Sequence, residues 1–165
     1  MTLVILVSII VLGVILLVLR ASRGAQRDLA SVRASIQDLL ERGYDNGFLL
    51  IQIAFTNRFL QFEKYVTSSA ESGVQMAFPR AKWAEPFFEA IREYCRLHKL
   101  DACVVNEGML DFLYVDFGKD IELACKSTID ILQDVFHVSQ KTKLFMRLEN
   151  ASPHRILRNP EHRDA

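Results

Sequence analysis

The sequence FLLIQIAFTNRFLQFEKYVTSSAESGVQMAF, residues 48–78, decides the fold of this chain. Three runs within it, residues 48–55, 58–67 and 73–78, are rich in β-branched and aromatic side chains. Such runs are typical of β-strands. A threonine–asparagine pair separates the first two runs as a tight turn, and a polar loop separates the second from the third. The stretch therefore predicts three consecutive antiparallel strands.

Strand and helix patterns alternate on the C-terminal side of this stretch. Pro86 suits the first turn of a helix, because the N–H that proline lacks has no partner at that position. The clearest helical pattern is at residues 119–136, where the apolar residues share one stripe and acidic residues lie at the N-terminal end. In chain order we predict a helix at residues 85–98, strands at 102–105 and 109–117, a helix at 119–136 and a strand at 142–148.

These elements predict an α+β fold. We expect an antiparallel sheet of about six strands, with two to three helices mainly on one face. The predicted domain, residues 44–150, has about the usual size of one domain and is long enough to bury a core. Residues 151–165 contain two prolines and no periodicity, which predicts a flexible tail.

An amphipathic pattern on the N-terminal side predicts a helix over residues 25–42, within a segment of residues 24–43. Its apolar residues recur at steps of three and four and so share one stripe. Two interpretations are open: the stripe packs on the domain's own sheet, or it pairs two chains in a short coiled coil and makes the protein a possible homodimer. The stripe residues, which are also candidates for partner binding, are Leu29, Val32, Ile36 and Leu39.

Residues 3–19 read LVILVSIIVLGVILLVL, and only Ser8 and Gly13 interrupt the aliphatic run. A helix of this length spans roughly 26 Å, and its neighbours extend it to about the hydrocarbon thickness of a bilayer. A cleavable signal peptide would have a basic residue before a shorter apolar run and a neutral cleavage region after it. The sequence has neither, so we predict a single transmembrane helix within an anchor segment, residues 1–23.

The orientation of this helix is predicted from its flanks. Arg20, Arg23 and Arg27 follow the apolar run, and no lysine or arginine precedes it. Flanks rich in lysine and arginine stay on the cytoplasmic side of a membrane, where they also meet anionic lipid headgroups. The three arginines therefore predict an N-terminus outside and a domain that faces the cytoplasm.

The charge and the cysteine content bear on nucleic-acid binding and on the redox compartment of the protein. The formal net charge is zero, and residues 43–150 contain twelve basic and fifteen acidic residues, net −3. Since no segment is polybasic, nucleic-acid binding through phosphate neutralisation is not expected. Cys95, Cys103 and Cys125 are odd in number and not closely spaced, and we interpret them as free thiols in a reducing compartment.

Motifs that carry chemistry are scarce. The sequence contains no Gly-rich phosphate loop, no Cys-x-x-Cys or His-x-x-x-His pair and no Gly-x-Ser-x-Gly elbow, so it predicts no cofactor, metal site or catalytic residue. Asp116 and Asp120 flank Gly118, where turn formation and helix capping are favoured over acid–base chemistry. Trp83 precedes a predicted helix and is a candidate partner contact, with core packing as the alternative.

The segment YVDFGKD, residues 114–120, and the later DVF, residues 134–136, resemble a strand-to-helix corner of a bacterial domain class. That class is the small α+β domains of the type III secretion chaperone-like kind, and the resemblance covers residues 59–148. It implies a protein-binding module that holds segments of partner proteins and often dimerises. It implies no catalytic residues.

The sequence is compatible with two functions of different class. The first is a membrane-anchored, cytoplasm-facing protein-interaction or scaffold module without catalysis, or an accessory subunit of a membrane complex. The second is an enzyme whose site is assembled from scattered residues such as Asp116, Asp120 and Cys103. Converging polar groups in a pocket would favour the enzyme, whereas an exposed apolar groove or an open sheet edge would favour protein binding.

Overall fold

The computed structural model describes residues 24–152 of the chain. The predicted transmembrane helix at residues 3–19, Arg20, Arg23 and most of the predicted tail lie outside the described residues. Among residues 24–152, no helix is both long enough and apolar enough to cross a membrane.

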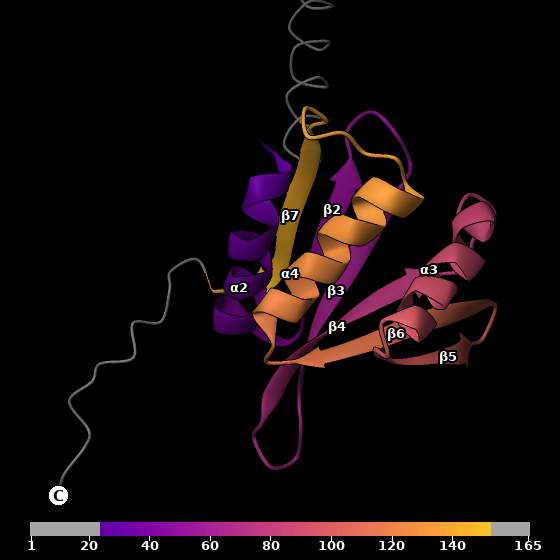
Figure 1. Cartoon of the computed structure of the whole chain (residues 1–165). Helices are drawn as coiled ribbons and strands as arrows, with labels where there is room; N and C mark the ends of the chain where they lie inside the picture. Colours follow the sequence, from indigo (N-terminus) through magenta and orange to yellow (C-terminus); the bar gives the residue numbers. More distant parts are fainter. Residues whose placement is uncertain (1–23, 153–165) are drawn as a thin grey trace, which may run out of the picture.

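Seven strands and three α-helices make up the described part of the chain (Figure 1). A 3₁₀ turn precedes the first of these helices, and a π-helical turn extends the last one. In chain order the elements are β1 (Ala25–Arg27), η1 (Leu29–Ser31), α2 (Val32–Arg42), β2 (Gly43–Ile53), β3 (Phe59–Val66), β4 (Ser72–Pro79), α3 (Glu85–Leu97), β5 (Asp101–Glu107), β6 (Leu110–Gly118), α4 (Ile121–Asp130), η2 (Ile131–Val135) and β7 (Leu144–Ala151).

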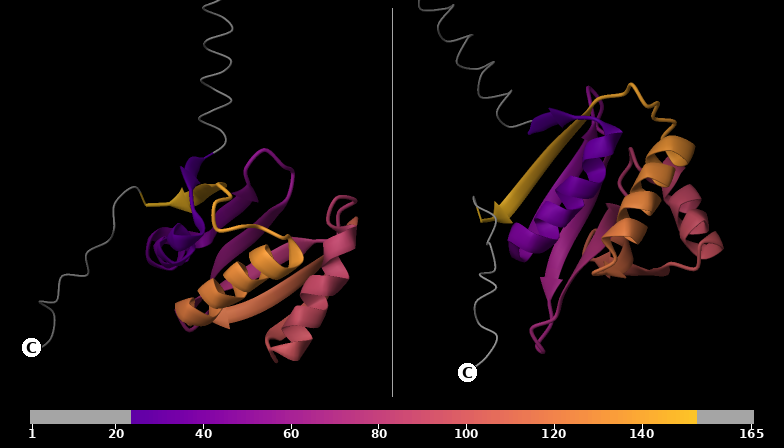
Figure 2. Two further views of the ribbon diagram at one scale, coloured as in Figure 1. Left: turned by 45° about the horizontal axis from the view of Figure 1, so that its top comes forward. Right: turned by 60° about the vertical axis from the view of Figure 1, so that its left-hand side comes forward.

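The seven strands form one antiparallel sheet in the order β1-β7-β2-β3-β4-β6-β5. β2, β3 and β4 are successive neighbours, which confirms the three antiparallel strands predicted from residues 48–78. The helices lie on one face of the sheet and the other face is open, as both views in Figure 2 show. The predicted α+β class is confirmed, but the sheet has seven strands where about six were expected.

β1 corrects the predicted helix over residues 25–42, because residues 25–27 form a strand. Its three residues pair with residues 144–146 of β7. Asp28 has an extended backbone, and its carboxylate accepts a hydrogen bond from the Ser31 hydroxyl at 3.0 Å. The edge of β7 thus supplies the backbone partners that another helical turn would have supplied. Arg27, one of the predicted topology determinants, lies in β1 and is exposed.

Residues 45–47, the sequence Asp-Asn-Gly that is typical of turns, are part of β2. The pairing of β2 with β7 shifts register at these residues, so they form a bulge within the strand. Asn46 has a φ of 60°, a left-handed conformation that asparagine tolerates better than most residues. A Cβ atom at Gly47 would lie 2.7 Å from the carbonyl oxygen of Asn150, so this close approach requires glycine.

The hydrophobic core lies between the helices and the covered face of the sheet. Alternate residues of the central strands point toward the helices, as the pleat of a strand requires. On the open face, the Tyr65 hydroxyl donates to Asp116 at 2.9 Å and the Tyr114 hydroxyl donates to Glu107 at 2.6 Å, so polar groups occupy this face. The core residues of the central strands include Leu49, Ile51, Leu60, Phe62, Val74, Met76, Leu113 and Val115.

The apolar stripe of α2 faces the domain's own sheet. Val32, Ile36 and Leu39 are 0% exposed, and Leu29 in the preceding 3₁₀ turn is 3% exposed. α2 lies against β2, β7 and α4. This packing agrees with the first interpretation of the stripe, and the four side chains have no free surface left for a coiled coil.

The burial of Ile36 gives a direct test of this packing. We expect Ile36→Asp to place an unpaired charge in the core and to lower the free energy of unfolding by at least about 3 kcal/mol. That is a large part of the roughly 5–15 kcal/mol available to a domain. Ala34→Asp is the control, because Ala34 lies on the exposed side of the same helix. Thermal unfolding of the full-length protein in detergent, followed by circular dichroism, should show a large loss for the first variant only; equal melting temperatures would contradict the packing.

Candidate functional site at the edge of the sheet

The structure describes all three residues of the enzyme hypothesis, Asp116, Asp120 and Cys103. Asp116 accepts a hydrogen bond from the backbone N–H of Gly118 at 2.8 Å. Asp120 is the N-cap of α4 and accepts a hydrogen bond from the backbone N–H of Leu123 at 2.9 Å. These contacts confirm the turn-forming and capping roles predicted for the two aspartates. Cys103 is exposed on β5.

Trp83, the remaining partner candidate from the sequence, contributes to the domain itself. Its ring is partly buried and lies 4.9 Å from the ring of Phe59 and 5.7 Å from the ring of Phe78. This position corresponds to the core-packing alternative. The partner candidates chosen from the sequence are therefore all packed, wholly or partly, against the domain's own core.

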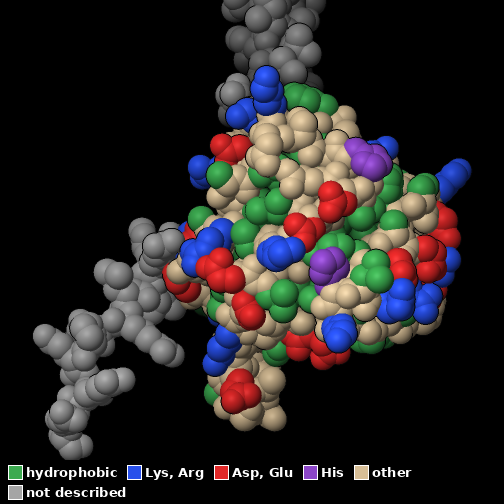
Figure 3. Space-filling view, in the orientation of Figure 1, with side chains coloured by type: hydrophobic (Ala, Val, Ile, Leu, Met, Phe, Trp, Pro, Cys, Tyr) green, Lys and Arg blue, Asp and Glu red, His purple; other side chains and the backbone are tan. Residues whose placement is uncertain are grey.

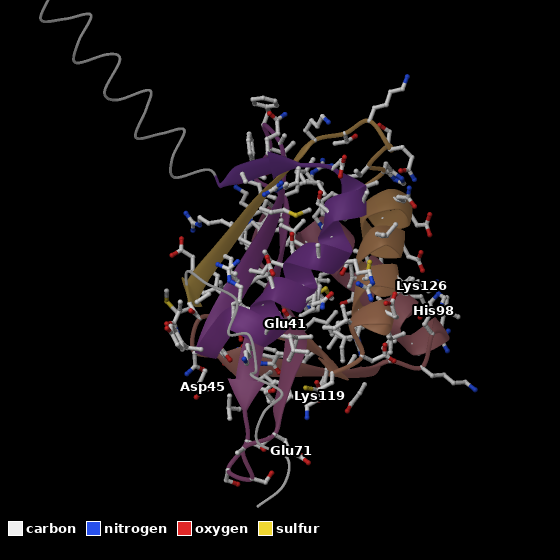
Figure 4. The ribbon with its side chains drawn as sticks, turned by 90° about the vertical axis from the view of Figure 1, so that its left-hand side faces the viewer. Glu41, Asp45, Glu71, His98, Lys119 and Lys126 are labelled. Atoms are coloured by element: carbon white, nitrogen blue, oxygen red, sulfur yellow. The ribbon has the colours of Figure 1, made fainter. Side chains whose placement is uncertain are left out.

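A polar cluster that the sequence did not indicate connects α3 to α4. The carboxylate of Asp130 accepts hydrogen bonds from the Tyr94 hydroxyl at 2.8 Å and from Lys126 Nζ at 2.5 Å. The ring of His98 lies 4.2 Å from that of Tyr94, and Figure 4 shows His98 and Lys126 on the same side of the molecule. Tyr94 and Asp130 are 36 positions apart in the chain, so no local spacing could have revealed their contact.

The protonation states of this cluster suit a structural link. Burial raises the pKa of Tyr94 to about 12, and the nearby Asp130 carboxylate adds to this effect. Burial alone would raise the pKa of Asp130, but hydrogen bonds from Lys126 and Tyr94 lower it. Near neutral pH a protonated phenol therefore donates to a charged carboxylate, a strong hydrogen bond between the two helices.

Metal ligation has no support in the described part of the chain. Within residues 24–152 there is no group of three or more His, Cys, Asp or Glu side chains placed to hold a metal ion.

β5 is the last strand of the sheet, and it differs from the other long strands in its exposure. It pairs with β6 on one side, and no described strand pairs with its other edge. All seven of its residues, Asp101–Glu107, are exposed, including Val104 at 45% and Val105 at 41%. A free strand edge presents backbone N–H and C=O groups that can pair with another extended segment.

Exposed apolar side chains gather around this edge. Among residues 24–152, nine large apolar side chains are exposed, and five of them belong to the end of α3 or to the β5–β6 hairpin. Single exposed apolar residues are ordinary, but a cluster of them indicates an interaction surface. The five are Leu97, Val104, Val105, Met109 and Leu110.

A groove of about 910 Å³ lies between β5 and α3. Its sheet side is apolar and its helix side is charged. Figure 3 shows acidic and basic side chains next to one another on the side of the molecule where α3 lies. The groove is lined by Ala102, Val104 and Leu113 from the strands and by Glu89, Arg92, Glu93 and Arg96 from the helix.

Comparisons with known proteins do not assign the chain to a family. No protein-family model matches it, and searches of curated proteins and of solved structures give no match. The resemblance to type III secretion chaperone-like domains therefore stays a prediction.

The three thiols provide a test of exposure at this site. Burial raises the pKa of Cys95 to about 11, and burial together with the charge of Glu122 raises the pKa of Cys125. Both side chains are buried, whereas Cys103 is exposed. Because the thiolate is the reactive form, we expect N-ethylmaleimide at neutral pH to modify one thiol per chain quickly and the other two only after unfolding. Intact mass and peptide mapping should place the fast label on Cys103; fast labelling of Cys95 would contradict the structure.

Proposed function

We propose that this chain is a membrane-anchored, cytoplasm-facing protein-interaction module without catalysis, and that its domain binds an extended segment along β5. The observation that carries the proposal is the free edge of β5 beside an apolar groove. The exposed apolar side chains around this edge are the surface that such a partner would cover.

An added strand would gain affinity and specificity from different groups. Its backbone would continue the hydrogen-bond ladder of the sheet, and alternate side chains would enter the groove. Val104 lies opposite the buried Leu113 of β6, so it faces α3, whereas Cys103 lies opposite Tyr114 and faces the open side. A segment with small or branched apolar residues at every second position fits this arrangement.

The proposed anchor rests on the sequence of residues 3–19 and on the arginines that follow it. Anchoring would keep the module at the membrane surface, where a partner need only present an extended segment within reach. The chemistry required of the domain is then recognition alone.

The orientation can be tested by thiol labelling in intact cells. In a Cys103→Ser background, we expect a cysteine at position 164 (Asp164→Cys) to resist a membrane-impermeant maleimide until the cells are permeabilised. A cysteine at position 2 (Thr2→Cys) is the matched control and should be labelled without permeabilisation. The reverse pattern would place the domain outside the cytoplasm.

The binding edge can be tested by photo-crosslinking in cells that express the full chain. We expect p-benzoylphenylalanine at Val104 to form an adduct with a polypeptide that covers β5. The same group at Leu123, an exposed position on α4 (38% exposed), is the control and should form little adduct. Mass spectrometry then identifies the crosslinked residue of the partner. Equal adduct formation at both positions, or none at Val104, would overturn β5 as the binding edge.

A further inference from the structure

The chemistry of β5 and α3 also specifies an occupant for the edge. Resting on the proposed function, we infer that a second copy of this chain binds at the edge of β5. The two β5 strands pair antiparallel around a two-fold axis at Cys103. The two α3 helices then lie antiparallel above the joined sheet. The evidence is the complementarity of these two elements with themselves.

The register follows from the face that each residue occupies. A two-fold axis perpendicular to the sheet places residues of the same face opposite each other, so one residue must lie opposite its own copy, with the axis between the two. An axis at Val104 would place Asp101 opposite Glu107 at both ends of the strand, and like charges in opposite positions repel. An axis at Val105 would place the polar Asn106 opposite Val104, on the side of the groove.

An axis at Cys103 separates Asp101 from Glu107 and keeps Asn106 away from Val104, and Asp101 then lies opposite Val105 on the open side of the sheet. It places Ala102 opposite Val104 of the second copy, so two small apolar side chains meet on the groove side of the strand. It leaves Glu107 beyond the paired part of the second copy's β5, which begins at Asp101. The repulsion between Asp101 and Glu107 in the first register is thus relieved, because the strand has shifted by two residues along its neighbour.

The helices above the strand show the same self-complementarity. In two antiparallel copies of α3, Glu89 lies opposite Arg96 and Arg92 lies opposite Glu93. These four side chains line the same groove as Ala102 and Val104, so they lie on the side of α3 that a second copy at β5 would approach. They are 52–69% exposed and make only ion pairs within their own chain, such as Arg96 with Glu93 at 2.6 Å and Arg92 with Glu89 at 3.4 Å. A second copy would therefore turn two pairs into a charge network across the axis.

Disulfide crosslinking of the full-length protein in detergent tests the register. Residues opposite each other in an antiparallel pair have Cα atoms about 4.5–5.5 Å apart, within the range of about 4.4–6.8 Å that a disulfide spans. With copper–phenanthroline and dissolved oxygen as the oxidant, two Cys103 thiols lose two protons and two electrons and form one S–S bond. We expect rapid formation of a covalent dimer by the natural chain and none by Cys103→Ser.

Two variants in the Cys103→Ser background distinguish crosslinking in the proposed register from crosslinking by random collision of chains. Val104→Cys alone should crosslink slowly, because position 104 lies opposite position 102. Val104→Cys combined with Ala102→Cys should crosslink as fast as the natural chain. Faster crosslinking by Val104→Cys alone than by Cys103 would overturn the register.

The charge network gives a test without covalent chemistry. We expect Glu93→Arg to place two arginines face to face across the axis and to raise the dimer Kd at least about tenfold in sedimentation experiments. Arg92→Glu added to Glu93→Arg should restore the dimer, because it reverses both signs. A natural chain that sediments as a monomer in detergent would overturn the second copy as occupant. If the Val104 photo-adduct then contains a different protein, the proposed function still stands.

Discussion

The structure depends on the burial of one face of a seven-stranded sheet beneath three helices. A helix with its side chains is about 10 Å wide and strands lie about 4.8 Å apart, so three helices shield the width of about six strands. The sheet therefore has more strands than the helices can cover. One end of the sheet is β1, a strand of only three residues, and at the other end the seven residues of β5 remain exposed.

The position of α3 makes this mismatch more pronounced. The rings of Phe87 and Phe136 meet at 4.8 Å, and the hydrogen bond from Tyr94 to Asp130 joins the same two helical regions. Both contacts hold α3 toward the end of α4, and α3 also contacts β5 and β6. α3 therefore lies beside β5 without closing the groove between them. The partly buried polar link and the exposed groove are thus two features of the position of α3.

The sequence predicted the fold class better than the site, for physical reasons. Residues 48–78 carry local strand patterns and tight turns, so three neighbouring strands could be predicted from short-range information. β1 could not, because its three residues are extended only through pairing with β7, more than a hundred residues away. The run ACVV in β5 was correctly predicted as strand, but its edge position depends on the order of all seven strands. Trp83 and the stripe of α2 were conspicuous in the sequence because they are apolar, and for the same reason the fold buries them.

The two ends of the sheet also bear on how far an assembly of this chain could extend. A sheet that pairs at both edges would grow without limit, which is the usual danger of exposed strands. Here β1 is too short to accept a full partner strand, and it ends at Asp28, where the chain turns into the 3₁₀ helix. Pairing at β5 around a two-fold axis uses a seven-residue edge of each copy, and within residues 24–152 it leaves outside β1 and the part of β7 that β1 does not pair, residues 147–151. Such an interface closes on itself, so a second copy at β5 would satisfy the exposed edge without opening a path to fibres.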